Sequence, residues 1–127
     1  MVLLYQRSIK MTYSPGLHIL SEFNTGQLDL LSTCAACRGL FDRLIDQYAL
    51  AKVGEVYHDF EGGGFTAVVC LTESHLSIHT WPEFGLATFD IFLSNYQKDN
   101  TEKVRAIYEQ VLDFFEGVER QKTELIR

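Results

Sequence analysis

The sequence predicts an α+β two-layer sandwich, in which two helices cover one face of a mainly antiparallel sheet. Two long segments, residues 27–50 and 101–115, carry apolar side chains at steps of three and four, which is the helical period. The other apolar segments are short, rich in β-branched and aromatic residues, and bounded by glycine, proline or asparagine. Most of these short segments follow one another between the helices, which favours antiparallel hairpins over parallel strands joined by helical crossovers.

The first strand is expected at residues 17–23, LHILSEF, because Pro15 and Gly16 predict a turn before it and residues 24–26, Asn-Thr-Gly, end it. A single continuous helix is expected next, over residues 27–50. Its apolar stripe consists of Leu28, Leu30, Leu31, Cys34, Cys37, Leu40, Phe41, Leu44, Ile45 and Tyr48.

Four strands are expected after this helix. Residues 52–60 and 65–72 flank Glu61 and three glycines, which suits a hairpin with a flexible loop. Residues 74–81, SHLSIHTW, alternate in polarity, and residues 86–92, LATFDIF, follow a short break that begins with Pro82.

The second helix is expected at residues 101–115, with Asn100 or Thr101 as its N-cap and Glu102 in its first turn. Val104, Ile107, Tyr108, Val111, Leu112 and Phe115 form its apolar face. A short final strand is expected at residues 119–126.

Length and composition indicate one domain over residues 1–127, in which residues 1–14 form a loosely ordered extension. With 127 residues and 46% apolar content, the chain is long enough for one core and too short for two ordinary domains. The net charge of -6 argues against a nucleic-acid partner. The absence of a signal-peptide core or a long apolar span, together with an odd number of cysteines, predicts a cytoplasmic protein that does not enter a membrane.

Two motifs that suggest redox or metal chemistry have simpler interpretations. Cys34-Ala-Ala-Cys37 falls inside the predicted long helix, and no second cysteine pair completes a zinc site, so both are interpreted as buried helix-face residues. His75 and His79 are four residues apart, a spacing that would place them about 13 Å apart on one face of a strand. No metal site is therefore predicted.

The sequence Glu73-Ser74-His75, followed by residues 78–83, Ile-His-Thr-Trp-Pro-Glu, closely resembles the signature of the short prokaryotic S-adenosylmethionine decarboxylases. The resemblance extends from about residue 17 to the last helix and includes residues 90–92, Asp-Ile-Phe. No G-x-S-x-G elbow is present, so a hydrolase triad is not indicated.

The resemblance implies that Ser74 is consumed. Its hydroxyl attacks the Glu73 carbonyl, and the peptide bond becomes an ester. Loss of the α-proton then breaks the ester, and hydrolysis of the resulting dehydroalanine leaves a pyruvoyl cofactor on the second fragment. In this family the pyruvoyl ketone and the substrate amine form a Schiff base that stores the charge left by departing carbon dioxide. The implied product feeds spermidine and polyamine synthesis, and the implied assembly is a homodimer with each site at or near the interface.

The resemblance also assigns roles around Ser74. His79, five residues further on, corresponds to the histidine that removes the α-proton, and Thr66 to a serine whose hydroxyl stabilises the cleavage intermediate. Phe60 corresponds to an aromatic residue that stacks on adenine, and Glu83 to a carboxylate that binds ribose hydroxyls.

One position departs from the family pattern. Twenty residues after Ser74, relatives have a proton-donating cysteine, where this chain has Ser94. A serine hydroxyl is far less acidic than a thiol, whose pKa is about 8.5. Two alternatives therefore stand beside an S-adenosylmethionine decarboxylase: a related enzyme for another cationic amino acid, such as ornithine or arginine, and an uncleaved homologue that regulates an active paralogue. Phe60 and Glu83 favour the nucleoside substrate.

Overall fold

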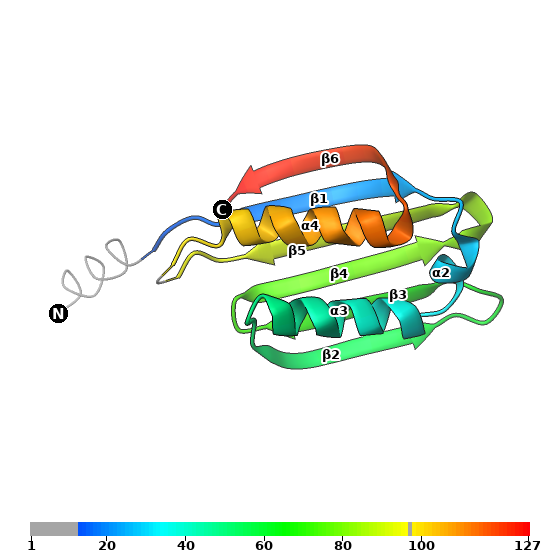
Figure 1. Cartoon of the computed structure of the whole chain (residues 1–127), viewed down its shortest axis with the longest axis horizontal. Helices are drawn as coiled ribbons and strands as arrows, with labels where there is room; N and C mark the ends of the chain where they lie inside the picture. The colour runs from blue at the N-terminus through cyan, green and yellow to red at the C-terminus, as the bar shows by residue number, and fades with distance from the viewer. Residues whose placement is uncertain (1–12, 97) are drawn as a thin grey trace.

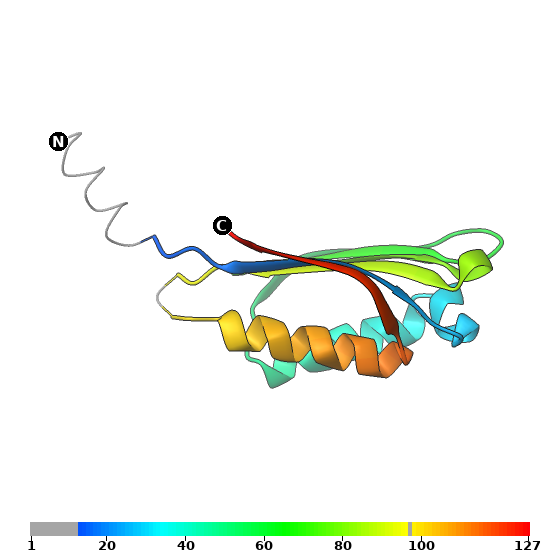
Figure 2. The same ribbon diagram turned by 90° about the horizontal axis from the view of Figure 1, so that it is seen from above.

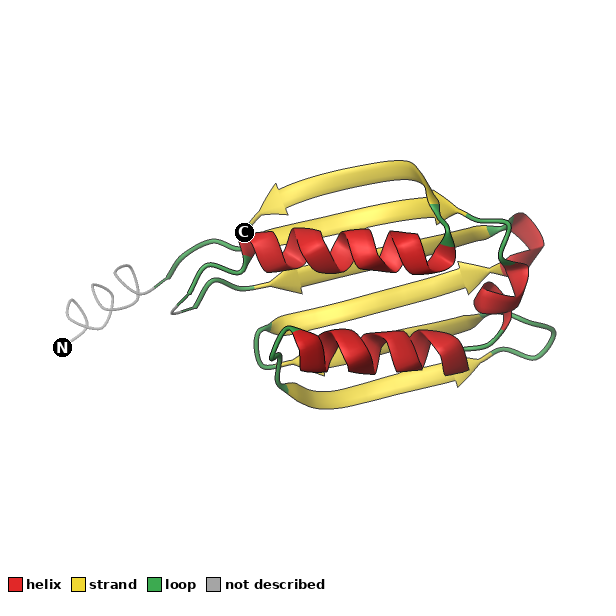
Figure 3. Cartoon of the chain, viewed as in Figure 1, coloured by secondary structure: helices red, strands yellow, loops and turns green. Residues whose placement is uncertain are grey.

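The computed structural model describes residues 13–96 and 98–127, and the extension expected at residues 1–14 lies almost wholly outside them. The described chain forms one six-stranded sheet with strand order β2-β3-β4-β5-β1-β6, and every neighbouring pair is antiparallel. The predicted α+β two-layer sandwich is confirmed, because the helices lie on one face of the sheet (Figures 1, 2 and 3). No described helix is long and apolar enough to cross a membrane.

Most elements begin and end within a residue or two of the predicted bounds. The strands are β1 (Leu17–Asn24), β2 (Lys52–Asp59), β3 (Phe65–Leu71), β4 (Ser74–Trp81), β5 (Leu86–Leu93) and β6 (Val118–Ile126). The helices are α2 (Leu28–Ser32), α3 (Ala35–Gln47) and α4 (Thr101–Phe115), with a 3-10 turn η1 at Pro82–Phe84.

The core lies between the sheet and the helices. Alternate residues of β3, β4 and β5 point into it, as their alternating burial shows, and the apolar stripes of α3 and α4 complete it. The largest buried side chains are Tyr108, Phe23, Phe41, Phe65, Phe89 and Phe115. The remaining strand residues point to the opposite face of the sheet, which no described helix covers (Figure 2). That surface is called the open face below.

The expectation of one helix over residues 27–50 is wrong, because the helix is broken between Ser32 and Cys34. Thr33 is extended, and the last carbonyls of α2 accept hydrogen bonds from the sheet. The Leu31 carbonyl accepts from the Thr80 hydroxyl at 2.7 Å, and the Ser32 carbonyl accepts from the Gly64 amide at 3.0 Å. Donors from β4 and from the turn before β3 thus bind two carbonyls that a continuous helix would have paired with its own amides.

The break also corrects the expected position of the cysteine motif. Cys34 is the N-cap of α3 and not a mid-helix residue, and its amide donates to the Asp59 carboxylate at 2.8 Å. Burial and the Asp59 carboxylate raise the pKa of the Cys34 thiol, and burial raises that of Cys37. Both shifts disfavour the reactive thiolate, so the interpretation of the pair as packing residues holds despite the helix start.

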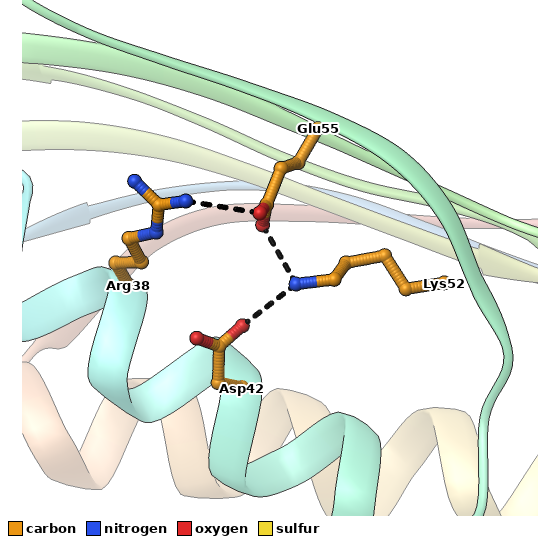
Figure 4. A network of polar contacts seen from close by, with 4 residues as sticks. All are labelled: Arg38, Asp42, Lys52 and Glu55. Carbon is orange, nitrogen blue, oxygen red and sulfur yellow. Dashed lines mark hydrogen bonds and ion pairs between the residues drawn. The ribbon is translucent and has the colours of Figure 1, made fainter.

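Edge strand β2 is fastened to α3 by a chain of ionic contacts (Figure 4). The Glu55 carboxylate accepts from Arg38 and from Lys52, each at 3.0 Å, and Lys52 also donates to Asp42 at 3.2 Å. The Arg38 guanidinium lies 4.9 Å from the centre of the Tyr57 ring. Glu55 is the shared acceptor, so its charge holds strand and helix together.

Glu55→Gln is expected to lower the midpoint of thermal unfolding by about 2–4 °C at low salt. Each partly exposed ion pair contributes little to stability, but this substitution removes the two pairs that share Glu55. Molar salt should shrink the difference, since it screens the pairs in the wild type. Calorimetry at both salt concentrations measures this. The control is Glu109→Gln on exposed α4 surface, which removes the same charge without breaking this network. Equal midpoints for Glu55→Gln and wild type at low salt would contradict the prediction.

Candidate active site

The sharp turn between β3 and β4 places an unusual backbone conformation at Ser74. β3 ends at Leu71 and β4 begins at Ser74, which pairs with Leu93 of β5. The φ angle of Ser74 is 155°, in a region that essentially only glycine adopts without cost. A serine held there stores about 1–3 kcal/mol of backbone strain. The strain falls on the residue whose peptide bond with Glu73 is the predicted cleavage point.

The carbonyl of that peptide bond faces a fixed hydrogen-bond donor. The backbone amide of Ser94 donates to the Glu73 carbonyl oxygen at 2.9 Å. The Glu73 carboxylate is held separately, by the Thr72 hydroxyl at 2.9 Å and the Ala51 amide at 3.4 Å. A preorganised amide aimed at a carbonyl stabilises negative charge on its oxygen when a nucleophile adds. The structure therefore joins Glu73, Ser74 and Ser94 into one group.

A cavity of about 380 Å³ adjoins this group. It is lined by Thr72, Glu73, Ser94, Tyr96, Lys98 and Asn100. Burial and the nearby Lys98 ammonium lower the pKa of Lys103, and Glu73 opposes that shift. The β5–α4 loop thus brings positive charge close to Glu73, and Ser94, which is predicted to replace a cysteine of the family, lies on the cavity wall.

The other predicted site residues form a second group at the far end of β3 and β4. Thr66 pairs with His79 in the strand register, and the Phe60 ring centroid lies 5.4 Å from that of His79. The His79 ring also contacts Trp81, with centroids 4.2 Å apart. Glu83 lies in η1, directly after β4. His79 alternates with buried residues of β4, so it belongs to the open face.

The two groups do not meet within one chain. His79 lies five residues along β4 from Ser74, which corresponds to about 16–17 Å at the strand rise of 3.3 Å per residue. A histidine that removes the Ser74 α-proton must come within hydrogen-bonding reach of it. The predicted site residues of a single chain therefore fall into two groups, named here for their predicted roles: the cleavage half-site, Glu73, Ser74 and Ser94, and the binding half-site, Phe60, Thr66, His79 and Glu83.

The open face near the cleavage half-site carries a row of aromatic rings. His18 lies with its ring centroid 5.7 Å from that of His75 and 5.2 Å from that of Phe92. Burial and the neighbouring His75 lower the pKa of His18, which favours the neutral imidazole. A second hollow of about 450 Å³ lies on the same face over β1, β5 and β6, with Glu22 and Asp90 among its lining residues. The open face is therefore contoured and largely aromatic beside Ser74.

The sequence signals missed two features of the site. The Ser94 amide is a backbone group, and no residue pattern marks a backbone donor. Asn100 was expected only as a helix cap, yet its side chain bonds to the Ser94 carbonyl at 2.7 Å. The one available signal was the pairing of a strand after Glu73 with the strand before Ser94, which brings the two positions together.

Comparisons with known proteins point to one family. Residues 17–127 match the model of the S-adenosylmethionine decarboxylase family. An S-adenosylmethionine decarboxylase proenzyme of Archaeoglobus fulgidus is 37% identical over 100 residues, which cover 79% of this chain and 86% of the relative. The Aquifex aeolicus proenzyme is 40% identical over 82 residues, 65% of this chain and 61% of its own length.

A crystal structure of the adenosylmethionine decarboxylase of Aquifex aeolicus superimposes with a TM-score of 0.74 at 28% identity, and the match covers 91% of this chain and 90% of that one. Fold and sequence thus agree over the segment that holds both half-sites. The chain belongs to the S-adenosylmethionine decarboxylase family.

Proposed function

We propose that this chain is the proenzyme of a pyruvoyl-dependent S-adenosylmethionine decarboxylase, which cuts itself between Glu73 and Ser74 and serves polyamine synthesis. One observation carries the proposal: the Glu73 carbonyl accepts the Ser94 amide at 2.9 Å, directly beside the strained Ser74. A polarised carbonyl next to a strained serine is what an attack by that serine requires.

The cleavage follows from groups of the chain itself. The Ser74 hydroxyl adds to the Glu73 carbonyl carbon, and the Ser94 amide stabilises the negative oxygen. The C–N bond then breaks, the freed Ser74 amine takes a proton, and an ester joins the two residues. Removal of the Ser74 α-proton breaks the ester C–O bond, and Glu73 leaves as a carboxylate. Water then displaces ammonia from the dehydroalanine, and a pyruvoyl ketone remains. Breaking the Glu73–Ser74 bond also removes the φ strain.

The surroundings of Ser74 suit this cofactor and its substrate. When formed, the pyruvoyl group supplies an electron sink for loss of carbon dioxide from an amino acid. The adjoining cavity of about 380 Å³ would give the substrate access to this end of β4, and its lining by Ser94 supports a role for that residue beside the reacting carbon. Phe60 supplies a ring for stacking on adenine and Glu83 a carboxylate for ribose hydroxyls.

The active unit proposed here is a homodimer in which two open faces pack against each other. The half-sites lie at opposite ends of β4: His79 belongs to the open face, which no described helix covers (Figure 2), and Ser74 is the first residue of the strand, next to the turn after β3. A two-fold axis that reverses the strand direction would bring the binding half-site of one copy to the end of β4 that holds the cleavage half-site of the other. Each site would then be complete, and a dimer would hold two.

Denaturing mass spectrometry of the freshly purified chain tests this function. We expect two fragments that divide between Glu73 and Ser74, the second lighter by the mass of ammonia than the same fragment beginning with serine. Ser74→Ala should give one uncut species. Borohydride should add two hydrogens to the second fragment, since it reduces the ketone. A wild-type chain that stays intact on long incubation would refute self-cleavage. It would favour the alternative of an uncleaved homologue, which rests on the presence of Ser94 where a cysteine is expected.

A further inference from the structure

Asn100 occupies the N-cap position of α4 but does not cap the helix. Asparagine at an N-cap normally accepts a hydrogen bond from the second or third helical amide through its side-chain oxygen. Asn100 makes no such bond, and the Asp99 carboxylate accepts a hydrogen bond from the amide of Thr101, the first residue of the helix, at 2.9 Å. A buried asparagine that forgoes the usual cap has its side chain committed elsewhere.

The side chain of Asn100 is committed to the peptide of Ser94. Its Nδ2 donates to the Ser94 carbonyl at 2.7 Å, and the residue is 1% exposed. The opposite amide orientation would place oxygen against oxygen, so the hydrogen bond fixes which atom faces Ser94. The backbone amide of Asn100 donates in turn to the Asn95 side chain at 2.8 Å, and Asn95 donates to the Pro15 carbonyl at 2.8 Å.

The Leu93–Ser94 peptide is also confined by the chain before β1. A Cβ at Gly16 would overlap the Leu93 carbonyl oxygen and lie 3.0 Å from the Ser94 Cα, so the chain before β1 is in close contact with this segment. Gly16 and Asn100 therefore both restrain residues 93–94. The amide of Ser94, which points at the Glu73 carbonyl, has little freedom to turn away.

We propose that Asn100 is a positioning residue for self-cleavage, and this inference rests on the proposed function. By holding the Ser94 carbonyl, which belongs to the Ser94–Asn95 peptide, it restrains rotation of the Ser94 backbone, so that the amide of the preceding Leu93–Ser94 peptide polarises the Glu73 carbonyl while the Ser74 hydroxyl adds. Asn100 itself touches no reacting atom. Without its donor, the loop after β5 can rotate, and the negative oxygen loses its preorganised partner.

Asn100→Asp tests this inference because it keeps the shape and replaces the donor with an acceptor. Removing a direct oxyanion donor costs about 100-fold or more, so loss of its support is expected to slow cleavage at least tenfold. The matched control is Gln110→Glu, the same amide-to-carboxylate change on the same helix, where the wild-type amide bonds to Tyr48. It should cleave at the wild-type rate. Thermal midpoints of both variants reveal any general loss of stability.

A hydroxylamine chase separates positioning from later steps, because hydroxylamine cuts the ester but not the peptide bond. His79→Ala should accumulate ester and be cut, whereas Asn100→Asp should resist, since its defect precedes the ester. In a Ser74→Ala background, which cannot cleave, Asn100→Asp should also speed hydrogen exchange at the Ser94 amide. NMR measures this exchange rate independently of cleavage.

The outcomes are distinguishable. If the wild type cleaves and Asn100→Asp cleaves equally fast, or if the variant accumulates hydroxylamine-sensitive ester, the positioning role is wrong and the proposed function stands. If Asn100→Asp does not fold, Asn100→Ser, which retains a shorter donor, should fold and cleave at an intermediate rate, and wild-type cleavage by it would overturn the role. A wild-type chain that never cleaves overturns both proposals.

Discussion

A Ser74→Ala chain and a His79→Ala chain, each uncut alone, are expected to cleave when they form a mixed dimer. In the proposed assembly, the His79→Ala chain keeps Ser74, and its Ser74→Ala partner supplies the missing histidine. One site of each mixed dimer is then complete and the other lacks both groups. In a random equal mixture about half of the His79→Ala chains should be cut, and no Ser74→Ala chain should be.

Intact mass after co-expression measures this result, because the two variants differ in mass and each fragment can be assigned to its parent chain. His58→Ala serves as the matched control: His58 is another open-face histidine beside Phe60, and its loss should leave self-cleavage unchanged. If mixed dimers form but remain uncut, the histidine acts within its own chain, and the two half-sites would have to approach by a large rearrangement of β4. If His79→Ala cleaves fully alone, His79 is not the base.

An element was predicted accurately when the pattern that indicates it lies within the segment itself. Residues 74–81 and 101–115 were predicted with the bounds that β4 and α4 have, since polarity alternation and a helical stripe are properties of the segment itself. The helix predicted over residues 27–50 failed because Thr80 and Gly64 take the carbonyls of Leu31 and Ser32. Those donors are remote in sequence, so no periodicity could report them.

For the candidate site, too, the sequence indicated the residues but not their arrangement in space. The signature around Ser74 selected the residues of both half-sites, but it said nothing of their separation, which depends on β4 being extended. The resemblance centred all the roles on Ser74, whereas the structure places His79 and Thr66 at the other end of the strand. The hydrogen bond to the Glu73 carbonyl was likewise hidden, because its donor is the backbone amide of Ser94, whose own carbonyl accepts from the side chain of Asn100.

Ser94→Cys is expected to raise the rate of decarboxylation by about 100-fold or more, because a positioned general acid contributes about 10²–10⁴-fold and a thiol is far more acidic than an aliphatic hydroxyl. Self-cleavage should proceed at the wild-type rate, since residue 94 supports the Glu73 carbonyl through its backbone amide, which the substitution keeps. The two activities of one residue thus depend on different atoms. Ser94 lines the cavity of about 380 Å³, so the larger sulfur has space.

Carbon dioxide release from S-adenosylmethionine by the fully processed chain measures turnover, and the cleavage rate is followed separately by intact mass. The rate of the variant should fall as pH rises through the thiol pKa, about 8.5 when unperturbed, because a thiolate has no proton to give. Ser77→Cys, which places a thiol on the open face of β4 away from the cavity, should show neither the gain nor that pH dependence. If Ser94→Cys turns over no faster than wild type, proton delivery does not limit this chain. The role of Ser94 would then be confined to its backbone amide. Its departure from the cysteine expected for the family would reflect either a different substrate or a different proton donor in the same cavity. Tyr96 and Lys98, which also line the cavity, would be the first candidate donors to test by substitution.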